Sequence, residues 1–179
     1  MISLGSLFNR QPEPLIGLDI SSSSIKLVEL GRNKAGEYVL ERCAIEPLEQ
    51  GWVVDGNIEK FDDVAESVRR IVKKSGTRTK NVALALPASA VITKKIVLPG
   101  GLTEQELELQ VESEANQYIP FSLDEVSLDF CVVGPSVASV GDVEVLIAAS
   151  RREKVQDRQG LAEAAGLKPV ILDVESYAS

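Results

Sequence analysis

Residues 17–30 read GLDISSSSIKLVEL, which is two short apolar runs separated by four serines. The first run, residues 15–20, has no clean alternation of polar and apolar side chains, a pattern typical of a strand covered on both faces. Small hydroxyl residues between two such runs are typical of a tight turn. The stretch therefore predicts an antiparallel hairpin whose turn lies at residues 21–24.

The elements after this hairpin can be predicted from changes in hydrophobic period. A turn at residues 33–36 precedes a third strand over residues 38–45. Apolar residues from 61 to 72 recur at helical spacing, with acidic side chains early and basic side chains late, as the helix dipole favours. Short apolar runs at residues 82–86 and 91–98 predict two more strands. The order is therefore βββαβ up to residue 86, followed by a new segment.

A second helix is predicted to begin at Thr103, because Thr103 and Glu106 have the spacing of a capping box. Leu102 and Leu107 occupy the positions of a hydrophobic staple, and Pro120 is expected to end the helix. Its predicted core face is Leu107, Val111, Ala115 and Tyr118. The remaining expected elements are strands over 126–133 and 143–150, a helix over 151–165 and a strand over 170–174.

Composition indicates a globular protein that does not bind nucleic acid. Hydrophobic residues make up 44% of the 179 residues, enough to bury a core. Lys and Arg total 19 against 27 Asp and Glu, a formal charge of −8. A chain with this net negative charge is not suited to neutralise the phosphate backbone of a nucleic acid. No stretch approaches the ~20 apolar residues that span a bilayer, and the N-terminus lacks the features of a signal peptide. We therefore expect a cytoplasmic protein with a flexible tail over residues 1–14.

The residue types restrict the chemistry further. The chain has no histidine, which excludes histidine-based triads and histidine metal sites. Cys43 and Cys131 each lie in an apolar run without a neighbouring thiol, so neither is expected to bind a metal. Cys131 is expected to behave as a small hydrophobic residue. Ordinary hydrolase chemistry is disfavoured.

The serine hairpin is a candidate phosphate-binding site. A carboxylate at the end of a strand, a turn of hydroxyl residues and a lysine on the returning strand can surround a phosphate group. Asp19 could also hold Mg²⁺ through water, because magnesium keeps several of its waters. A solvated turn without a ligand is the alternative. The candidate residues are Asp19, Ser21, Ser22, Ser23, Ser24 and Lys26.

These residues carry a resemblance to a known family. Residues 17–30 are similar to the phosphate-1 motif of actin-fold ATPases, and particularly to that of the PilM family and its relative, the cell-division protein FtsA. Many members of the superfamily have glycine where this chain has Ser21, which leaves less room for a phosphate. Three further stretches resemble the PilM family in particular: residues 89–96, residues 112–129, and residues 148–153 leading to 173–178. The resemblance extends over essentially the whole chain from Leu15 onward.

The resemblance implies an α/β fold with α+β character. It consists of an actin-like, ribonuclease H-like subdomain 1A interrupted by a subdomain 1C of the SHS2 type. Subdomain 1A is expected over residues 15–86 and 170–179, and subdomain 1C over residues 87–169. Family members are about twice as long, and this chain corresponds to their N-terminal half. Their ATP and Mg²⁺ are implied as cofactors, but the adenosine-binding and catalytic motifs belong to the other half. We therefore expect no enzyme activity, and weak or no binding of ATP.

The function implied by the resemblance is a scaffold for type IV pilus assembly, peripheral to the inner membrane. Such a scaffold binds the N-terminal cytoplasmic peptide of PilN, an inner-membrane protein, in a groove between subdomains 1A and 1C. Other pilus motor or platform proteins are further candidate partners, and an uncovered apolar face of subdomain 1A predicts a homodimer. The candidate peptide-binding residues are Val91, Ile92, Thr93, Lys94, Tyr118, Ile119 and Phe121; ordinary packing is their alternative role.

Two other functions stay open at this point. The chain could be a membrane-associated cytoskeletal protein like FtsA, which uses a C-terminal membrane-targeting helix that this sequence does not contain. It could also belong to an ATPase or phosphotransferase of the actin fold, whose catalytic residue would lie in the second lobe. Release of phosphate from the purified chain would favour the latter.

Overall fold

The computed structural model describes residues 14–177, so the tail expected over residues 1–14 lies outside this range except for Pro14. The chain divides into two compact units. The first unit comprises residues 14–85 and 158–173 of the described range, and the second comprises residues 86–157 and 174–177. Each unit has a sheet and a hydrophobic core of its own.

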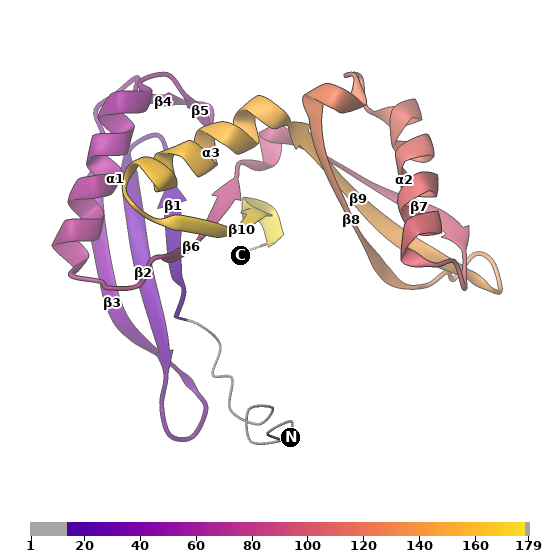
Figure 1. The fold of residues 1–179 in the computed structure, drawn as a ribbon, viewed down its shortest axis with the longest axis horizontal. Coiled ribbons are helices and arrows are strands. Elements are labelled where there is room, and N and C mark those ends of the chain that lie inside the picture. Colours follow the sequence, from indigo (N-terminus) through magenta and orange to yellow (C-terminus); the bar gives the residue numbers. More distant parts are fainter. Residues whose placement is uncertain (1–13, 178–179) are drawn as a thin grey trace, which may run out of the picture. The chain divides into compact units, whose positions relative to one another are not determined.

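The first unit is built on a five-stranded sheet with the strand order β10-β6-β1-β2-β3 (Figure 1). β1 (Ile16–Ile20) and β2 (Ser24–Arg32) form the predicted hairpin. β3 (Tyr38–Pro47) pairs antiparallel with β2, and β6 (Asn81–Leu86) pairs parallel with β1. The remaining elements are β4 (Val53–Val54), β5 (Asn57–Ile58), helix α1 (Phe61–Ser75), the end of helix α3 (Arg152–Ala164) and β10 (Lys168–Val174). The short strands β4 and β5 were not predicted from the sequence.

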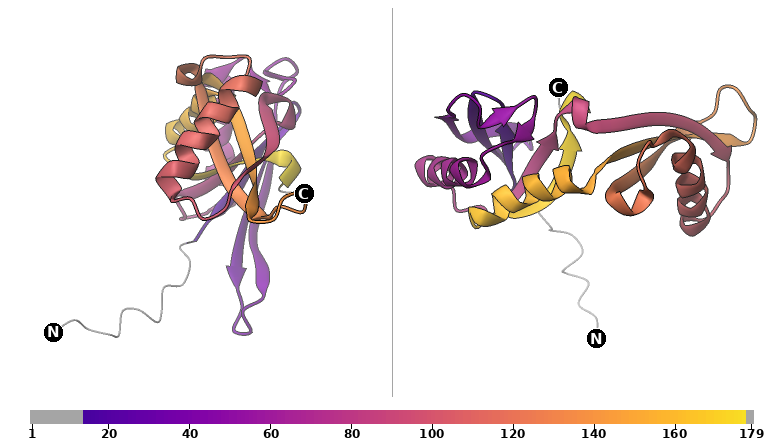
Figure 2. Two further views of the ribbon diagram at one scale, coloured as in Figure 1. Left: turned by 90° about the vertical axis from the view of Figure 1, so that its right-hand side faces the viewer. Right: turned by 90° about the horizontal axis from the view of Figure 1, so that it is seen from above.

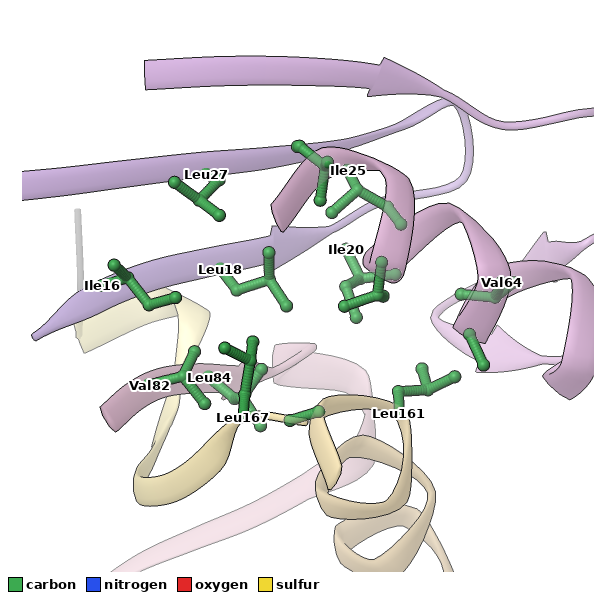
Figure 3. Packing of buried hydrophobic residues seen from close by; sticks show 14 of the residues in the cluster. Ile16, Leu18, Ile20, Ile25, Leu27, Val64, Val82, Leu84, Leu161 and Leu167 are labelled. Carbon is green, nitrogen blue, oxygen red and sulfur yellow. The ribbon is translucent and has the colours of Figure 1, made fainter. Parts of the chain in front are cut away.

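The core of the first unit lies on one face of its sheet. Figure 3 shows side chains of β1, β2 and β6 pointing toward those of α1 and α3. Along β1, Ile16, Leu18 and Ile20 are buried, whereas Gly17 is exposed and Asp19 is half-buried. The expectation that β1 is covered on both faces is therefore wrong for the described part of the chain. Gly17 and Asp19 interrupt the apolar run at alternate positions, which is the pattern of a strand covered on one face.

The second unit is a three-stranded antiparallel sheet covered by a helix. Its strand order is β7-β9-β8, and Figures 1 and 2 show helix α2 lying along one face of the sheet. The helix buries Val111 and Ala115 against residues of all three strands. The bounds are β7 (Val91–Pro99), α2 (Glu104–Tyr118), β8 (Val126–Pro135) and β9 (Asp142–Arg151), with 3-10 turns at Ala88–Ala90, Leu123–Glu125 and Glu175–Tyr177.

The predicted start of α2 is confirmed in detail. Thr103 Oγ1 accepts the backbone N–H of Glu106, and the Glu106 carboxylate accepts the backbone N–H of Thr103 at 2.8 Å. One residue of the predicted core face is misplaced, because Tyr118 is 46% exposed. Tyr118 is the last residue of the helix, and the next residue, Ile119, enters the core in its place, while the Tyr118 ring stays at the surface.

The boundary between the two units differs from the predicted one. Residues 158–169 were assigned to the inserted subdomain, but Leu161, Ala162 and Leu167 are buried in the core of the first unit. Helix α3 therefore belongs to the second unit by its first turns and to the first unit by its second half. The reason is local, since the three buried apolar residues of α3 and the following turn are the ones that complete the core above β1 and β6.

The environment of the cysteines also differs from expectation. Cys43 on β3 and Cys131 on β8 are both exposed. Both strands lie at the edge of their sheets, and each cysteine occupies the uncovered face. The apolar neighbours of Cys131 in the sequence therefore do not indicate burial.

Candidate functional site

The turn of the serine hairpin is closed by hydrogen bonds between its first and last residues. The backbone N–H and the hydroxyl of Ser21 both donate to the carbonyl oxygen of Ser24, at 3.0 and 2.9 Å. The carbonyl oxygen of Ser23 accepts the backbone N–H of Leu48 at 2.9 Å. Ser22 and Ser23 are exposed. The donors of Ser21 are thus used inside the turn, and the exposed hydroxyls are those of the two central serines.

The two charged residues of the candidate site contact each other. Asp19 and Lys26 are opposite each other in the hairpin register, and Lys26 Nζ lies 2.8 Å from Asp19 Oδ2. Both side chains are about half exposed. A phosphate group would have to compete with Asp19 for the lysine, although a lysine and nearby hydroxyls are of the type that binds phosphate.

Asp19 also fits a magnesium ion by residue type. Magnesium in nucleotide sites is bound by one or two carboxylates together with phosphate oxygens and water. Within residues 14–177, no group of three or more Asp, Glu, Cys or His side chains is placed to bind a metal by itself. Asp19 could hold Mg²⁺ in the water-mediated manner predicted, with the nucleotide phosphates supplying further ligands.

A buried arginine that the sequence analysis missed supports the hairpin from α3. Arg158 is only 3% exposed and donates to the carbonyl oxygens of Ile20, at 3.4 Å, and Gly56, at 2.9 Å. Ile20 is the last residue of β1 before the serine turn. The signal in the sequence is weak, because an arginine in a predicted helix is usually solvated. Its burial follows from the packing of α3 against the first unit.

The candidate peptide-binding residues of β7 lie on an edge strand. β7 pairs only with β9 in the three-stranded sheet, so its other edge is not paired within the sheet. Val91 and Ile92 are half-buried, and Thr93 and Lys94 are exposed. Lys94 Nζ lies 4.8 Å from the centre of the Tyr118 ring, a cation–π contact. The structure thus brings together two of the predicted residues from separate elements.

The other two candidates differ in accessibility. Ile119 is 8% exposed and lies in the core of the second unit, which favours the packing role given as its alternative, and its contact with a partner stays a prediction. Phe121 is half-buried, and the guanidinium of Arg151 lies 4.1 Å from its ring centre. Phe121 therefore keeps an accessible edge beside a cation, whereas Ile119 has a packing role.

A shallow depression of the second unit lies near these residues in the sequence. It has a volume of about 430 Å³ and is open to solvent. The Ser122 hydroxyl donates to the Asp124 carboxylate and lowers the pKa of that carboxyl, with further lowering by the backbone N–H of Asp124 and the charge of Arg152. The depression is lined by Leu109, Glu112, Ser113, Asn116, Ser122, Leu123 and Asp124, none of which was predicted as a site residue.

Comparisons with known proteins identify the family. The family model described as "Type IV pilus assembly protein PilM" matches residues 17–179. A solved structure of a PilM-PilN type IV pilus biogenesis complex is 34% identical, with a TM-score of 0.81 over 92% of this chain. This chain covers 48% of that protein, which is about half of its length.

A more distant likeness concerns the fold alone. The cytoplasmic domain of EpsL, an inner-membrane component of the type II secretion system of Vibrio cholerae, is 14% identical with a TM-score of 0.55. It aligns with 90% of this chain, which covers 57% of that domain. No helix among residues 14–177 is both long and apolar enough to cross a bilayer. The expected fold class, a mixed α/β fold of the actin-like type, is confirmed, and the chain belongs to the PilM family of type IV pilus assembly proteins.

Proposed function

We propose that this chain acts in type IV pilus assembly by binding the N-terminal cytoplasmic peptide of a PilN-type inner-membrane protein. The observation that carries the proposal is the 34% identity, over 92% of the chain, with a protein solved as a PilM-PilN complex. The proposal includes the groove that the family resemblance implies for subdomains 1A and 1C. It also implies a cytoplasmic position at the inner membrane, held there through the partner.

The second unit supplies features that suit an extended peptide. An edge strand offers backbone N–H and C=O groups, and pockets or anchors beside it provide specificity. β7 is such a strand, and the Lys94–Tyr118 pair places an exposed aromatic ring and a cation beside it. Aromatic residues are frequent among the side chains that contribute most to binding. Tyr118 is therefore the residue that we expect to matter most.

The test is a calorimetric titration with a synthetic peptide of the N-terminal cytoplasmic segment of a PilN-type protein from the same organism. Binding in the micromolar range is expected, and a scrambled peptide should not bind. Tyr118→Ala should weaken binding about tenfold. Tyr38→Ala is the matched control, since Tyr38 is also an exposed tyrosine under a cation, with Arg32 at 4.3 Å. Failure of the unmodified chain to bind the peptide at micromolar concentration would refute the proposal.

The second part of the proposal is that this chain neither hydrolyses ATP nor binds it tightly. A nucleotide held by half of a two-lobed site loses most of its contacts, and this chain covers 48% of its solved relative. In addition, Lys26 is paired with Asp19 and the donors of Ser21 are used within the turn. Titration with Mg-ATP should give no saturable isotherm, and phosphate release should stay at buffer background. A tight isotherm would contradict weak binding, and steady phosphate release would favour the ATPase alternative.

A further inference from the structure

The strand β3 is an exposed edge of the first unit. It forms one end of the sheet order and has ten residues, of which only Ala44 and Glu46 are not exposed. Leu40 and Ile45 are each 59% exposed. A long edge strand with exposed apolar side chains is a template for pairing with another strand.

The contacts of β3 define which side chains lie on each face of the sheet. Arg42 reaches the end of α1 and Glu46 pairs with Arg70 of α1 at 2.7 Å, so these two residues and Ala44 lie on the helix-covered face. Cys43 and Ile45 alternate with them and lie on the uncovered face.

An irregularity in the pairing changes this alternation. Glu29 is opposite Arg42, but the next residue, Leu30, is opposite Leu40, so Glu41 is an extra residue in β3. Arg32 is opposite Tyr38 and its guanidinium lies 4.3 Å from the Tyr38 ring centre. Since Leu30 and Arg32 continue the exposed positions of β2, their partners Leu40 and Tyr38 share the uncovered face with Cys43 and Ile45.

This change selects one register for antiparallel pairing of β3 with β3 of a second copy. Opposite residues of two antiparallel strands lie on the same face. Centring the pair between positions 41 and 42 places Tyr38 opposite Ile45, Leu40 opposite Cys43 and Glu41 opposite Arg42. Shifting it by one or two residues in either direction places side chains from different faces opposite each other. Only the register centred between positions 41 and 42 keeps opposite residues on the same face of the sheet over the whole of β3.

We propose that two copies of this chain associate through β3 in this register and form one continuous sheet around a two-fold axis. The register repeats the pair of Glu41 with Arg42 on both sides of the axis, as two-fold symmetry requires. The Arg42 side chain is 44% exposed although it also contacts Glu29 at 3.2 Å, so its charge can reach a second carboxylate. The exposed Tyr38, Leu40 and Ile45 form one apolar strip across the axis. This surface belongs to the first unit and does not involve the candidate peptide-binding residues.

The register can be tested by disulfide cross-linking, because Cys43 is native and exposed. In a Cys131→Ser background, Leu40→Cys places a thiol opposite Cys43 of the second copy. Because Glu41 is an extra residue, positions 40 and 43 of one copy lie opposite Leu30 and Val28, about 7 Å apart and at the ~7 Å limit for a disulfide, so the product that reports the register is the covalent dimer on a non-reducing gel. Oxidised glutathione should therefore convert Leu40→Cys into a covalent dimer that dithiothreitol reverses. Tyr38→Cys, whose partner is Ile45, should cross-link much less.

Sedimentation velocity over a concentration series tests the association without cross-linking. The Cys131→Ser chain should show a concentration-dependent dimer, and Glu41→Arg should weaken it about tenfold, because like charges then oppose each other twice. A chain that sediments as a monomer throughout would overturn the proposal. Equal cross-linking of the Tyr38→Cys and Leu40→Cys variants would also overturn the proposal, because the proposed register places only position 40 opposite Cys43 of the second copy. Neither result would affect the peptide titration, so the two proposals fail separately.

Discussion

Replacing Leu161 with alanine tests whether the second half of α3 belongs to the first unit. Leu161 is 0% exposed and packs in the core that contains Ile16 and Val82. Truncating a buried leucine removes about 2 kcal/mol of transfer free energy, and the cavity that remains raises the total to about 3–5 kcal/mol. Because the site is fully buried beside two strands of the sheet, we expect about 4 kcal/mol of destabilisation.

The assay is hydrogen exchange of backbone amides, which reports local stability along the chain. Leu161→Ala should reduce the protection of β1, β2 and β6 in the first unit. Leu98→Ala is the matched control, because Leu98 is 4% exposed in the core of the second unit, and it should reduce the protection of β7, β8 and β9. Leu109→Ala, at a position 68% exposed, should change little in either unit. Loss of protection in β7–β9 with β1 and β6 unaffected would refute the assignment of Leu161 to the first unit.

Three other substitutions test local features of the two units. Thr103→Ala removes the N-cap of α2 and should cost about 1 kcal/mol in thermal or urea unfolding. The backbone N–H of Thr103 and, second to it, the hydroxyl of Thr103 lower the pKa of Glu106 from 4.5, so this stabilisation is present above that pH and is lost as the pH falls through the lowered pKa. Thr103→Ala keeps the backbone N–H and removes the hydroxyl, so the acid sensitivity should decrease without disappearing, and an unchanged pH profile would contradict the role of the hydroxyl. Arg42→Met leaves the buried Glu29 carboxylate without its ion pair and should cost about 2 kcal/mol by urea unfolding, whereas the double change with Glu29→Gln should recover part of the loss. Gly100→Ala directs a methyl group at the backbone carbonyl oxygen of Gly141 and should reduce the free energy of unfolding by about 1–3 kcal/mol. An unchanged melting temperature would contradict this expectation, because it would mean that the turn moves aside without cost.

The elements of the fold were largely predictable because their signals are local. The apolar period of α1, the capping box of Thr103 and Glu106, and the serine turn of the first hairpin each depend on residues close in sequence. The strands β4 and β5 have two residues each, too few for a pattern of alternation, and they were missed. Among the candidate site residues, Asp19 and Lys26 were placed together by the hairpin register, which is also a local property.

The rest of the candidate site depended on contacts that no local pattern encodes. Lys94 and Tyr118 lie on different elements, and their contact requires that α2 end beside β7. Ile119 and Tyr118 are adjacent in the sequence, yet one is buried and the other is exposed. The direction in which the chain leaves the helix decides which of these two side chains is buried. The pattern of apolar residues in the sequence does not distinguish between them. The position of Arg158 beside Ile20 joins residues far apart in the sequence, and nothing near either residue indicates it.

The sequence by itself determined the order of the longer helices and strands, the position of the serine turn, the absence of histidine chemistry and the likeness to the PilM family, because these follow from residue types and short spacings. Only the tertiary structure decided which unit completes its core with α3, which face of β1 is covered, and which side chains of β3 are exposed at the sheet edge. The physical reason is that burial results from packing between distant segments. The free energy of burying Leu161 is gained against β1 and β6, which lie far from it along the chain.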